Sequence, residues 1–76
     1  MRTENSLKKK LSLGETVFGT WSALGSPPVM NCIAKSGMDF IITDMEHSTV
    51  SLETVEAQLY YTEIEDCTLI VRLGEV

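Results

Sequence analysis

The chain's single histidine follows two carboxylates that come directly after an apolar run. The stretch reads FIITDMEH, from Phe40 to His47, with Asp44 and Glu46 as its acids. An imidazole exchanges protons near neutral pH, and a neighbouring carboxylate both orients the ring and favours its protonated form. The spacing therefore indicates a site for general acid–base chemistry, in which Asp44 and Glu46 support His47.

Two further side chains of chemical interest stand near the ends of other apolar runs. Arg72 lies near the end of TLIVRL, and Trp21 lies in VFGTWSA. The planar guanidinium fork of arginine donates two parallel hydrogen bonds to a carboxylate or to a developing oxyanion. Ligands of parallel α/β folds collect beyond the carboxyl ends of the strands. We therefore expect Arg72 and Trp21 to bind substrate beside His47.

Each of these residues also has an ordinary structural interpretation. His47 would then cap the loop that follows it, Arg72 would form a surface ion pair, and Trp21 would belong to the core. A third interpretation has Asp44, Glu46 and His47 binding a metal, although their spacing lacks the HExxH pattern that puts two imidazoles on one helical face. The residue types alone leave these alternatives open.

The elements that must position these side chains alternate between helix and strand. In order, the sequence predicts a helix over 5–13 that Gly14 ends, a strand over 17–23, a helix over 27–36 that Gly37 ends, a strand over 38–45, a helix from 52 onward and a strand over 68–73. Such alternation implies right-handed crossovers and parallel pairing. The predicted fold class is α/β.

Particular residues predict how the helices begin and which faces are covered. Asn5 or Ser6 is the predicted N-cap of the first helix. Ser26 precedes two prolines and Ser51 precedes the last helix, so both serines are also predicted N-caps. Leu52, Val55 and Leu59 are spaced as an apolar stripe of that helix. The nearly continuous apolar run over 38–45 predicts a strand that is covered on both faces.

The bulk composition bounds the class of protein. The chain has 76 residues, enough for one small domain, with a net charge of -5 and a pI near 4.6. An anionic chain repels polyphosphate, so we expect no nucleic-acid partner and interpret Lys8–Lys10 as a solvated helix face. With neither a leader pattern nor an apolar run of about 18 residues, we expect a cytoplasmic protein without a membrane partner. Cys32 and Cys67 predict no disulfide framework, and we expect Cys32 to be a buried residue of its helix.

Three short motifs resemble those of a known enzyme family. GTW at Gly19–Trp21, DMEH at Asp44–His47 and VR at Val71–Arg72 occur in this order and spacing in the N-terminal part of the HpcH/HpaI aldolases. This resemblance implies a (β/α)8 barrel that makes or cleaves the bond between pyruvate and an aldehyde, with Mg²⁺ or Mn²⁺ holding the pyruvate enolate. It also implies that His47 is the base and that Arg72 binds the pyruvate oxygen.

The resemblance implies that residues 1–76 form one partial domain. A complete barrel needs about 250 residues, and the family's metal-binding Glu and Asp belong to later strands that no position here matches. We therefore expect no metal ligands in this chain and no catalysis by it alone. The uncovered strands predict a homo-oligomer or a complementing barrel segment, and a non-catalytic remnant that binds a partner is the alternative.

Overall fold

The computed structural model describes residues 5–48 and 50–74. Its elements are α1 (Ser6–Ser12), β1 (Gly19–Ser22), α2 (Pro27–Lys35), β2 (Phe40–Asp44), α3 (Leu52–Glu63) and β3 (Thr68–Arg72). The predicted alternation of helix and strand is confirmed. The strands are shorter than predicted, because 17–18 and 38–39 lead into the sheet rather than extending it.

The three strands form one parallel sheet in the order β1-β2-β3. Trp21 is level with Ile42, which is level with Ile70, and Asp44 is level with Arg72. Side chains at level positions of neighbouring strands point to the same face. The predicted parallel α/β class is therefore confirmed, and the sheet brings side chains of all three strands to one face.

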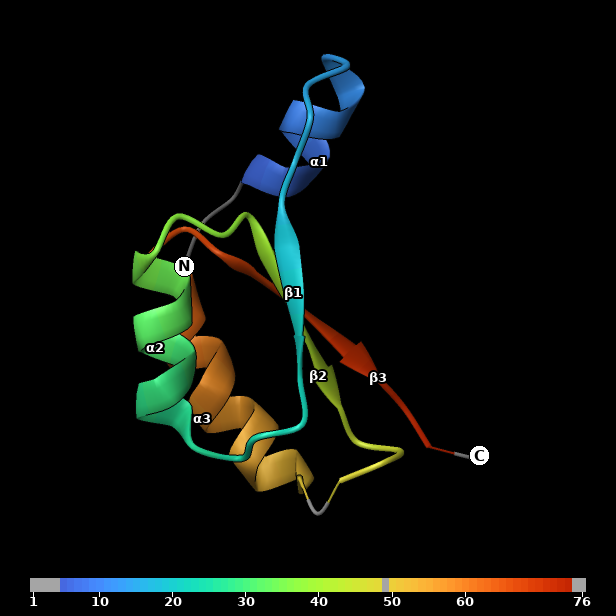
Figure 1. The fold of residues 1–76 in the computed structure, drawn as a ribbon, viewed down its shortest axis with the longest axis vertical. Helices are drawn as coiled ribbons and strands as arrows, with labels where there is room; N and C mark the ends of the chain where they lie inside the picture. The colour runs from blue at the N-terminus through green and yellow to red at the C-terminus, as the bar shows by residue number, and fades with distance from the viewer. Residues whose placement is uncertain (1–4, 49, 75–76) are drawn as a thin grey trace.

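Helices α2 and α3 pack side by side against one face of the sheet (Figure 1). The core between these layers contains Met30, Ala34, Ile41 and Cys67, all buried, with Leu69 packed against them. Burial raises the pKa of the Cys67 thiol to about 11, because the thiolate loses its hydration there. This layer fixes the helix-facing side of the strands and leaves the opposite side for Trp21 and Asp44.

The prediction that the second strand is covered on both faces is wrong for the residues that the structure describes. Ile41 and Thr43 are fully buried beneath the helices, whereas Phe40 and Ile42, on the other face, are only half-buried.

Two of the three helix starts use the predicted capping bond. The side chain of Asn5 accepts a hydrogen bond from the backbone N–H of Lys8 (3.0 Å), and that of Ser51 accepts one from Thr54 (3.2 Å). Ser26 occupies the predicted N-cap position, but its side chain makes no capping hydrogen bond. The predicted position is therefore confirmed and the predicted bond is wrong. The prolines that follow start α2 by their fixed φ and need no donor satisfied.

The apolar stripe predicted for α3 is not the face that packs. Leu52 is 72% exposed and Leu59 48% exposed, whereas Gln58 and Thr62 are fully buried. The Gln58 side chain donates to the carbonyl oxygen of Leu24 (3.2 Å) in the loop after β1. This polar contact sets the rotation of α3, because the loop carbonyls need a donor and apolar side chains supply none.

Asp39 ties α1 to the amino end of the sheet. Its carboxylate is 2.5 Å from Lys10 Nζ and accepts the backbone N–H of Phe18 (2.9 Å), while its carbonyl accepts the N–H of Thr68 (3.0 Å). The Lys10 hydrogen bond lowers the pKa of Asp39, and Asp39 raises the pKa of Lys10. The solvated face predicted for Lys8–Lys10 is therefore wrong at Lys10, because a partner 29 residues away binds it.

Two smaller expectations have different outcomes. Cys32 is exposed on α2, so the prediction that it is buried is wrong, because α2 packs through Met30 and Ala34. Along residues 5–48 and 50–74, the helices are too short and too polar to cross a bilayer.

Candidate active site

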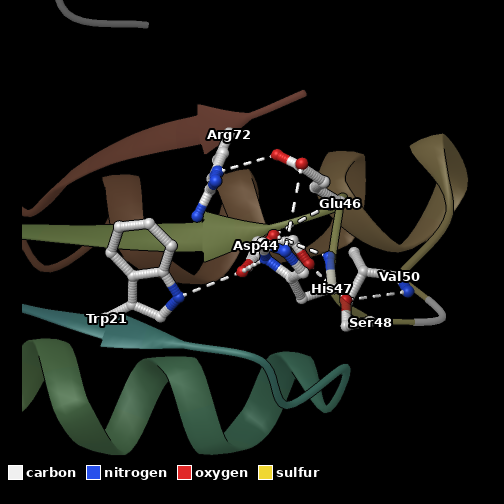
Figure 2. A network of polar contacts seen from close by, with 7 residues as sticks. All are labelled: Trp21, Asp44, Glu46, His47, Ser48, Val50 and Arg72. Atoms are coloured by element: carbon white, nitrogen blue, oxygen red, sulfur yellow. Dashed lines mark hydrogen bonds and ion pairs between the residues drawn. The ribbon is translucent and has the colours of Figure 1, made fainter. Parts of the chain in front are cut away.

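The predicted site residues converge at the carboxyl end of the sheet. Trp21 comes from β1, Asp44 from the end of β2 and Arg72 from the end of β3, while Glu46 and His47 lie on the loop after β2 (Figure 2). The backbone N–H of Met45, at the start of this loop, donates to the carbonyl of Arg72 (2.9 Å). The structure thus brings together all five side chains that the sequence singled out.

Asp44 is the hub of this cluster. Its Oδ1 accepts the backbone N–H groups of Glu46 (2.8 Å) and His47 (2.9 Å), and its Oδ2 accepts the indole N–H of Trp21 (3.2 Å). The backbone N–H of His47, followed by the His47 ring and the backbone N–H of Glu46, lowers the pKa of Asp44 to about 2, although burial opposes the shift. Asp44 is therefore a permanently charged, 2% exposed acceptor at neutral pH.

His47 is oriented by Asp44 but remains open to solvent. Its Nδ1 lies 3.1 Å from Asp44 Oδ2, while 60% of the side chain is exposed. A carboxylate is an acceptor only, so this contact assigns the hydrogen of the neutral ring to Nδ1. The other ring nitrogen, Nε2, then keeps its lone pair on the accessible side, where it can accept a proton.

A serine that the sequence analysis missed fixes the loop behind the imidazole. Ser48 Oγ donates to the carbonyl oxygen of Asp44 and accepts the backbone N–H of Val50 (3.2 Å). A serine that follows a strand end and precedes an apolar residue by two positions is the sequence signal for such a turn. Ser48 thus keeps His47 close to Asp44 through the backbone.

Arg72 is held between an aromatic face and a carboxylate. Its guanidinium carbon lies 5.3 Å from the centroid of the Trp21 ring, and its Nε lies 3.0 Å from Glu46 Oε2. Both charged side chains are about two-fifths exposed. A cation over an indole is a favourable and geometrically defined pair. The ion pair agrees with the structural alternative that the sequence analysis left open for Arg72, whereas the stacking on Trp21, which joins residues of different strands, was not anticipated.

Gly19 explains why the GTW motif begins with glycine. The Phe40 ring lies against it, and a Cβ added at Gly19 would come within 2.3 Å of the ring carbons of Phe40. These residues are level in the sheet and lie on the same face as Trp21 and Asp44. The Phe40 ring therefore packs over Gly19, and a side chain at position 19 would force the ring to move.

The described residues do not fit a self-contained metal site. Within residues 5–48 and 50–74, no three His, Cys, Asp or Glu side chains are grouped to hold an ion. Both oxygens of Asp44 already accept N–H donors, and Glu46 faces the cation of Arg72. The third interpretation, with Asp44, Glu46 and His47 as a metal-binding trio, therefore conflicts with the contacts these side chains make.

Comparison with known proteins identifies the relatives of this sequence. No family model matches. The 4-hydroxy-2-oxovalerate aldolase of Rhodococcus jostii is 39% identical over 70 residues, which are 91% of this chain and 27% of that protein. The 4-hydroxy-2-oxo-heptane-1,7-dioate aldolase of Shigella boydii is 36% identical over 56 residues, 74% of this chain and 21% of the relative. The chain thus spans about a quarter of the length of these relatives.

Solved structures agree with the sequence relatives. The crystal structure of the citrate synthase SbnG superposes with a TM-score of 0.89 at 33% identity, over 96% of this chain and 30% of that one. The HpcH/HpaI aldolase of Desulfitobacterium hafniense gives a TM-score of 0.84 at 31% identity, over 92% and 27%. The predicted resemblance is confirmed. In sequence and in fold, this chain corresponds to the N-terminal part of the HpcH/HpaI-type aldolase barrel.

Proposed function

We propose that this chain supplies the proton-transferring and anion-binding part of an aldehyde-lyase that forms or cleaves the carbon–carbon bond between pyruvate and an aldehyde. The observation that carries the proposal is the Asp44–His47 pair, which lies with Arg72 at the carboxyl end of the sheet. The aldolase relatives support it at the level of the reaction class. The proposed compartment is the cytoplasm.

His47 acts as the base in the proposed cleavage. Its Nε2 removes the proton from the hydroxyl of a 4-hydroxy-2-oxo acid, the bond between C3 and C4 breaks, and the aldehyde leaves. The electron pair of that bond becomes the enolate of pyruvate, which takes a proton at C3 from the His47 imidazolium, so that the imidazole is neutral again. Asp44 holds the ring by Nδ1 and stabilises the imidazolium that forms.

Arg72 and Trp21 form the substrate-binding side of the proposed site. The guanidinium binds the 2-oxo acid and stabilises the negative charge that develops on its oxygen during cleavage. Trp21 supports the guanidinium from one face and donates its indole N–H to Asp44. One indole thereby links the anion-binding arginine to the carboxylate that orients the base.

The proposal includes a divalent ion, Mg²⁺ or Mn²⁺, as the resemblance implies. Such an ion would polarise the oxo group of the substrate. Because the described residues do not offer it a ligand set, no step above depends on it.

A chimera tests the proposal. Residues 1–76 would replace the matching segment of the Rhodococcus jostii aldolase, and pyruvate release from a 4-hydroxy-2-oxo acid would be measured with Mg²⁺. We expect turnover that His47→Ala reduces by about 10²–10⁴-fold, because general acid–base catalysis contributes on that order.

The matched control is Glu56→Gln, on the exposed side of α3, which should leave the rate unchanged. Circular dichroism would establish that each variant is folded. An active chimera whose rate is the same with alanine at position 47 would show that His47 is not the base.

A second candidate function is a non-catalytic module that associates through the face opposite the helices. Trp21 and Ile70 on that face are half or two-fifths exposed, and Phe40 and Ile42 are only half-buried. An apolar sheet face of this kind favours association with further strands or with a second copy. Light scattering would reveal a defined oligomer, and Arg72→Ala would leave the oligomer intact.

A further inference from the structure

Glu46 contacts both functional groups of the cluster, although they come from different elements. One carboxylate oxygen, Oε2, lies 3.0 Å from Arg72 Nε, and the other, Oε1, lies 3.9 Å from His47 Nε2 (Figure 2). The backbone of Glu46 is itself fixed, because its N–H donates to Asp44 Oδ1 (2.8 Å). Glu46 is therefore an anchored carboxylate with one oxygen toward each group.

The contact determines which side of the guanidinium faces a ligand. Glu46 binds the Nε edge of Arg72, and the far end of the guanidinium turns toward the Trp21 ring (Figure 2). With one edge bound to Glu46 and one face against Trp21, the guanidinium has a single defined orientation. Its terminal nitrogens remain as the donors for an incoming oxo acid.

The negative charge of Glu46 has a second effect, on affinity. A 2-oxo acid that binds Arg72 brings a carboxylate close to the carboxylate already there, and like charges at such distances repel. Glu46 therefore opposes anion binding while it orders the groups that act on the bound anion. Orientation and affinity would respond in opposite directions to the loss of its charge.

We propose that Glu46 is a positioning residue that orients the Arg72 guanidinium relative to the His47 imidazole and weakens the binding of the substrate anion. This role rests on the function proposed above. An ion pair between side chains that are each about two-fifths exposed contributes little to stability. A merely structural pair would therefore leave both catalytic constants unchanged.

The first experiment measures the orientation of Arg72 in the chain itself. The sequence has two arginines, so the Nε–Hε signal of Arg72 in a nitrogen–proton correlation spectrum is assigned by its loss in Arg72→Lys. We expect Glu46→Gln to shift this signal and to speed its exchange with water. Glu56→Gln removes the same charge from α3 and should leave the signal in place.

The second experiment measures kcat and KM for pyruvate in the chimera, in the direction of bond formation. We expect Glu46→Gln to lower kcat by about 10- to 100-fold, as the loss of orienting groups does. KM should fall or stay the same, because the repulsion is gone. Glu46→Asp keeps the charge at a shorter reach and should restore the higher KM without restoring kcat.

The outcomes separate this inference from the proposed function. An Arg72 signal that Glu46→Gln leaves unchanged would overturn the positioning role, whether or not the chimera is active. An active chimera in which Glu46→Gln behaves as Glu56→Gln would also overturn it. A chimera without activity would instead count against the proposed function, and the Arg72 signal alone would then decide the role of Glu46.

Discussion

Two aspartates at opposite ends of β2 use the same chemistry for different purposes. Asp39, before the strand, binds Lys10 of α1 and the backbone N–H of Phe18 beside β1. Asp44, at the end of the strand, binds the backbone of Glu46 and both the backbone and the ring of His47. Both carboxyls have a lowered pKa because donors surround them.

The difference lies in which groups each aspartate holds. Asp39 joins an N-terminal helix to the sheet. Asp44 is almost fully buried, yet the imidazole and the indole that it holds are half exposed or more. Asp39 holds a lysine and a backbone N–H and so fastens α1 to the sheet, whereas Asp44 holds the imidazole and the indole of the candidate site. Asp39 and its partners Lys10 and Phe18 thus form a structural contact, called the clasp below, at the amino end of β2, whereas Asp44 belongs to the candidate site at its carboxyl end.

Replacing each aspartate in turn with asparagine should give the largest difference in catalytic rate between the two ends of β2. Asp44→Asn keeps an acceptor for the backbone N–H groups, but its NH₂ cannot accept from the imidazole, so the ring loses its assigned hydrogen position. In the chimera we expect pyruvate release to fall by about 10²–10⁴-fold. Asp39→Asn should lower the melting temperature and leave the rate per folded molecule unchanged. Equal losses of rate in both variants would remove the distinction between site and clasp.

Gly19→Ala should displace the Phe40 ring and destabilise the fold. Its new methyl would meet the Phe40 ring at 2.3 Å, so the ring must move, and overpacking of this kind costs about 1–3 kcal/mol. Urea denaturation measures the change in the free energy of unfolding. Gly25→Ala is the control, because its Cβ would meet only Thr54 Cγ2 at 3.8 Å. Similar losses in both variants would show that the Phe40 contact is not the cause.

Lowering the pH should reduce the free energy of unfolding, because it protonates the carboxylates at both ends of β2. The folded pKa of Asp44 is about 2, below the ordinary value near 4, so its contribution to stability is present above pH 4 and is lost as the pH falls toward 2. The lowered pKa of Asp39 acts in the same direction. Urea denaturation at a series of pH values should therefore show a steep acid limb, which becomes shallower in Asp44→Asn. An unchanged acid limb would mean that the hydrogen-bond donors do not lower the pKa of Asp44 in the folded state.

Alkali should also weaken the contact between Lys10 and Asp39, to a smaller extent and in addition to the loss caused by the raised pKa of the buried Cys67 thiol. The pKa of Lys10 is raised above 10.5, so its contribution is present below that pH and is lost as the pH rises through the raised folded value. The effect is small because 43% of the Lys10 side chain is exposed. In urea denaturation, Lys10→Met should reduce the alkaline loss and leave the part that belongs to Cys67. The same loss in Lys10→Met would assign it to another group.

Local signals predicted much of the fold. Asn5, Ser51 and the prolines after Ser26 start helices by interactions that lie within four residues, so the sequence contains both partners. Apolar β-branched runs predicted all three strands and their parallel order. The same reasoning predicted that His47 and Arg72 lie at one edge of the sheet, since the carboxyl ends of parallel strands meet.

Contacts between distant residues could not be predicted in this way. The rotation of α3 depends on Gln58 reaching a carbonyl 34 residues earlier, and periodicity cannot report that. The pairing of Lys10 with Asp39 and the stacking of Arg72 on Trp21 join residues far apart in sequence. The sequence singled out the candidate site residues, but the bonds that orient them arise only when the strands are paired.

The order β1-β2-β3, with every strand parallel to its predecessor, has a consequence for how the molecule is made. Each strand that leaves the ribosome finds its only earlier neighbour already synthesised, so the sheet can grow in one direction as translation proceeds. Each pairing must nevertheless wait for the crossover helix between the strands, which a hairpin would not require. β1 and β2 can therefore pair before β3 joins them, so the contact between Asp44 and the indole of Trp21 can form before Arg72 takes its place beside it.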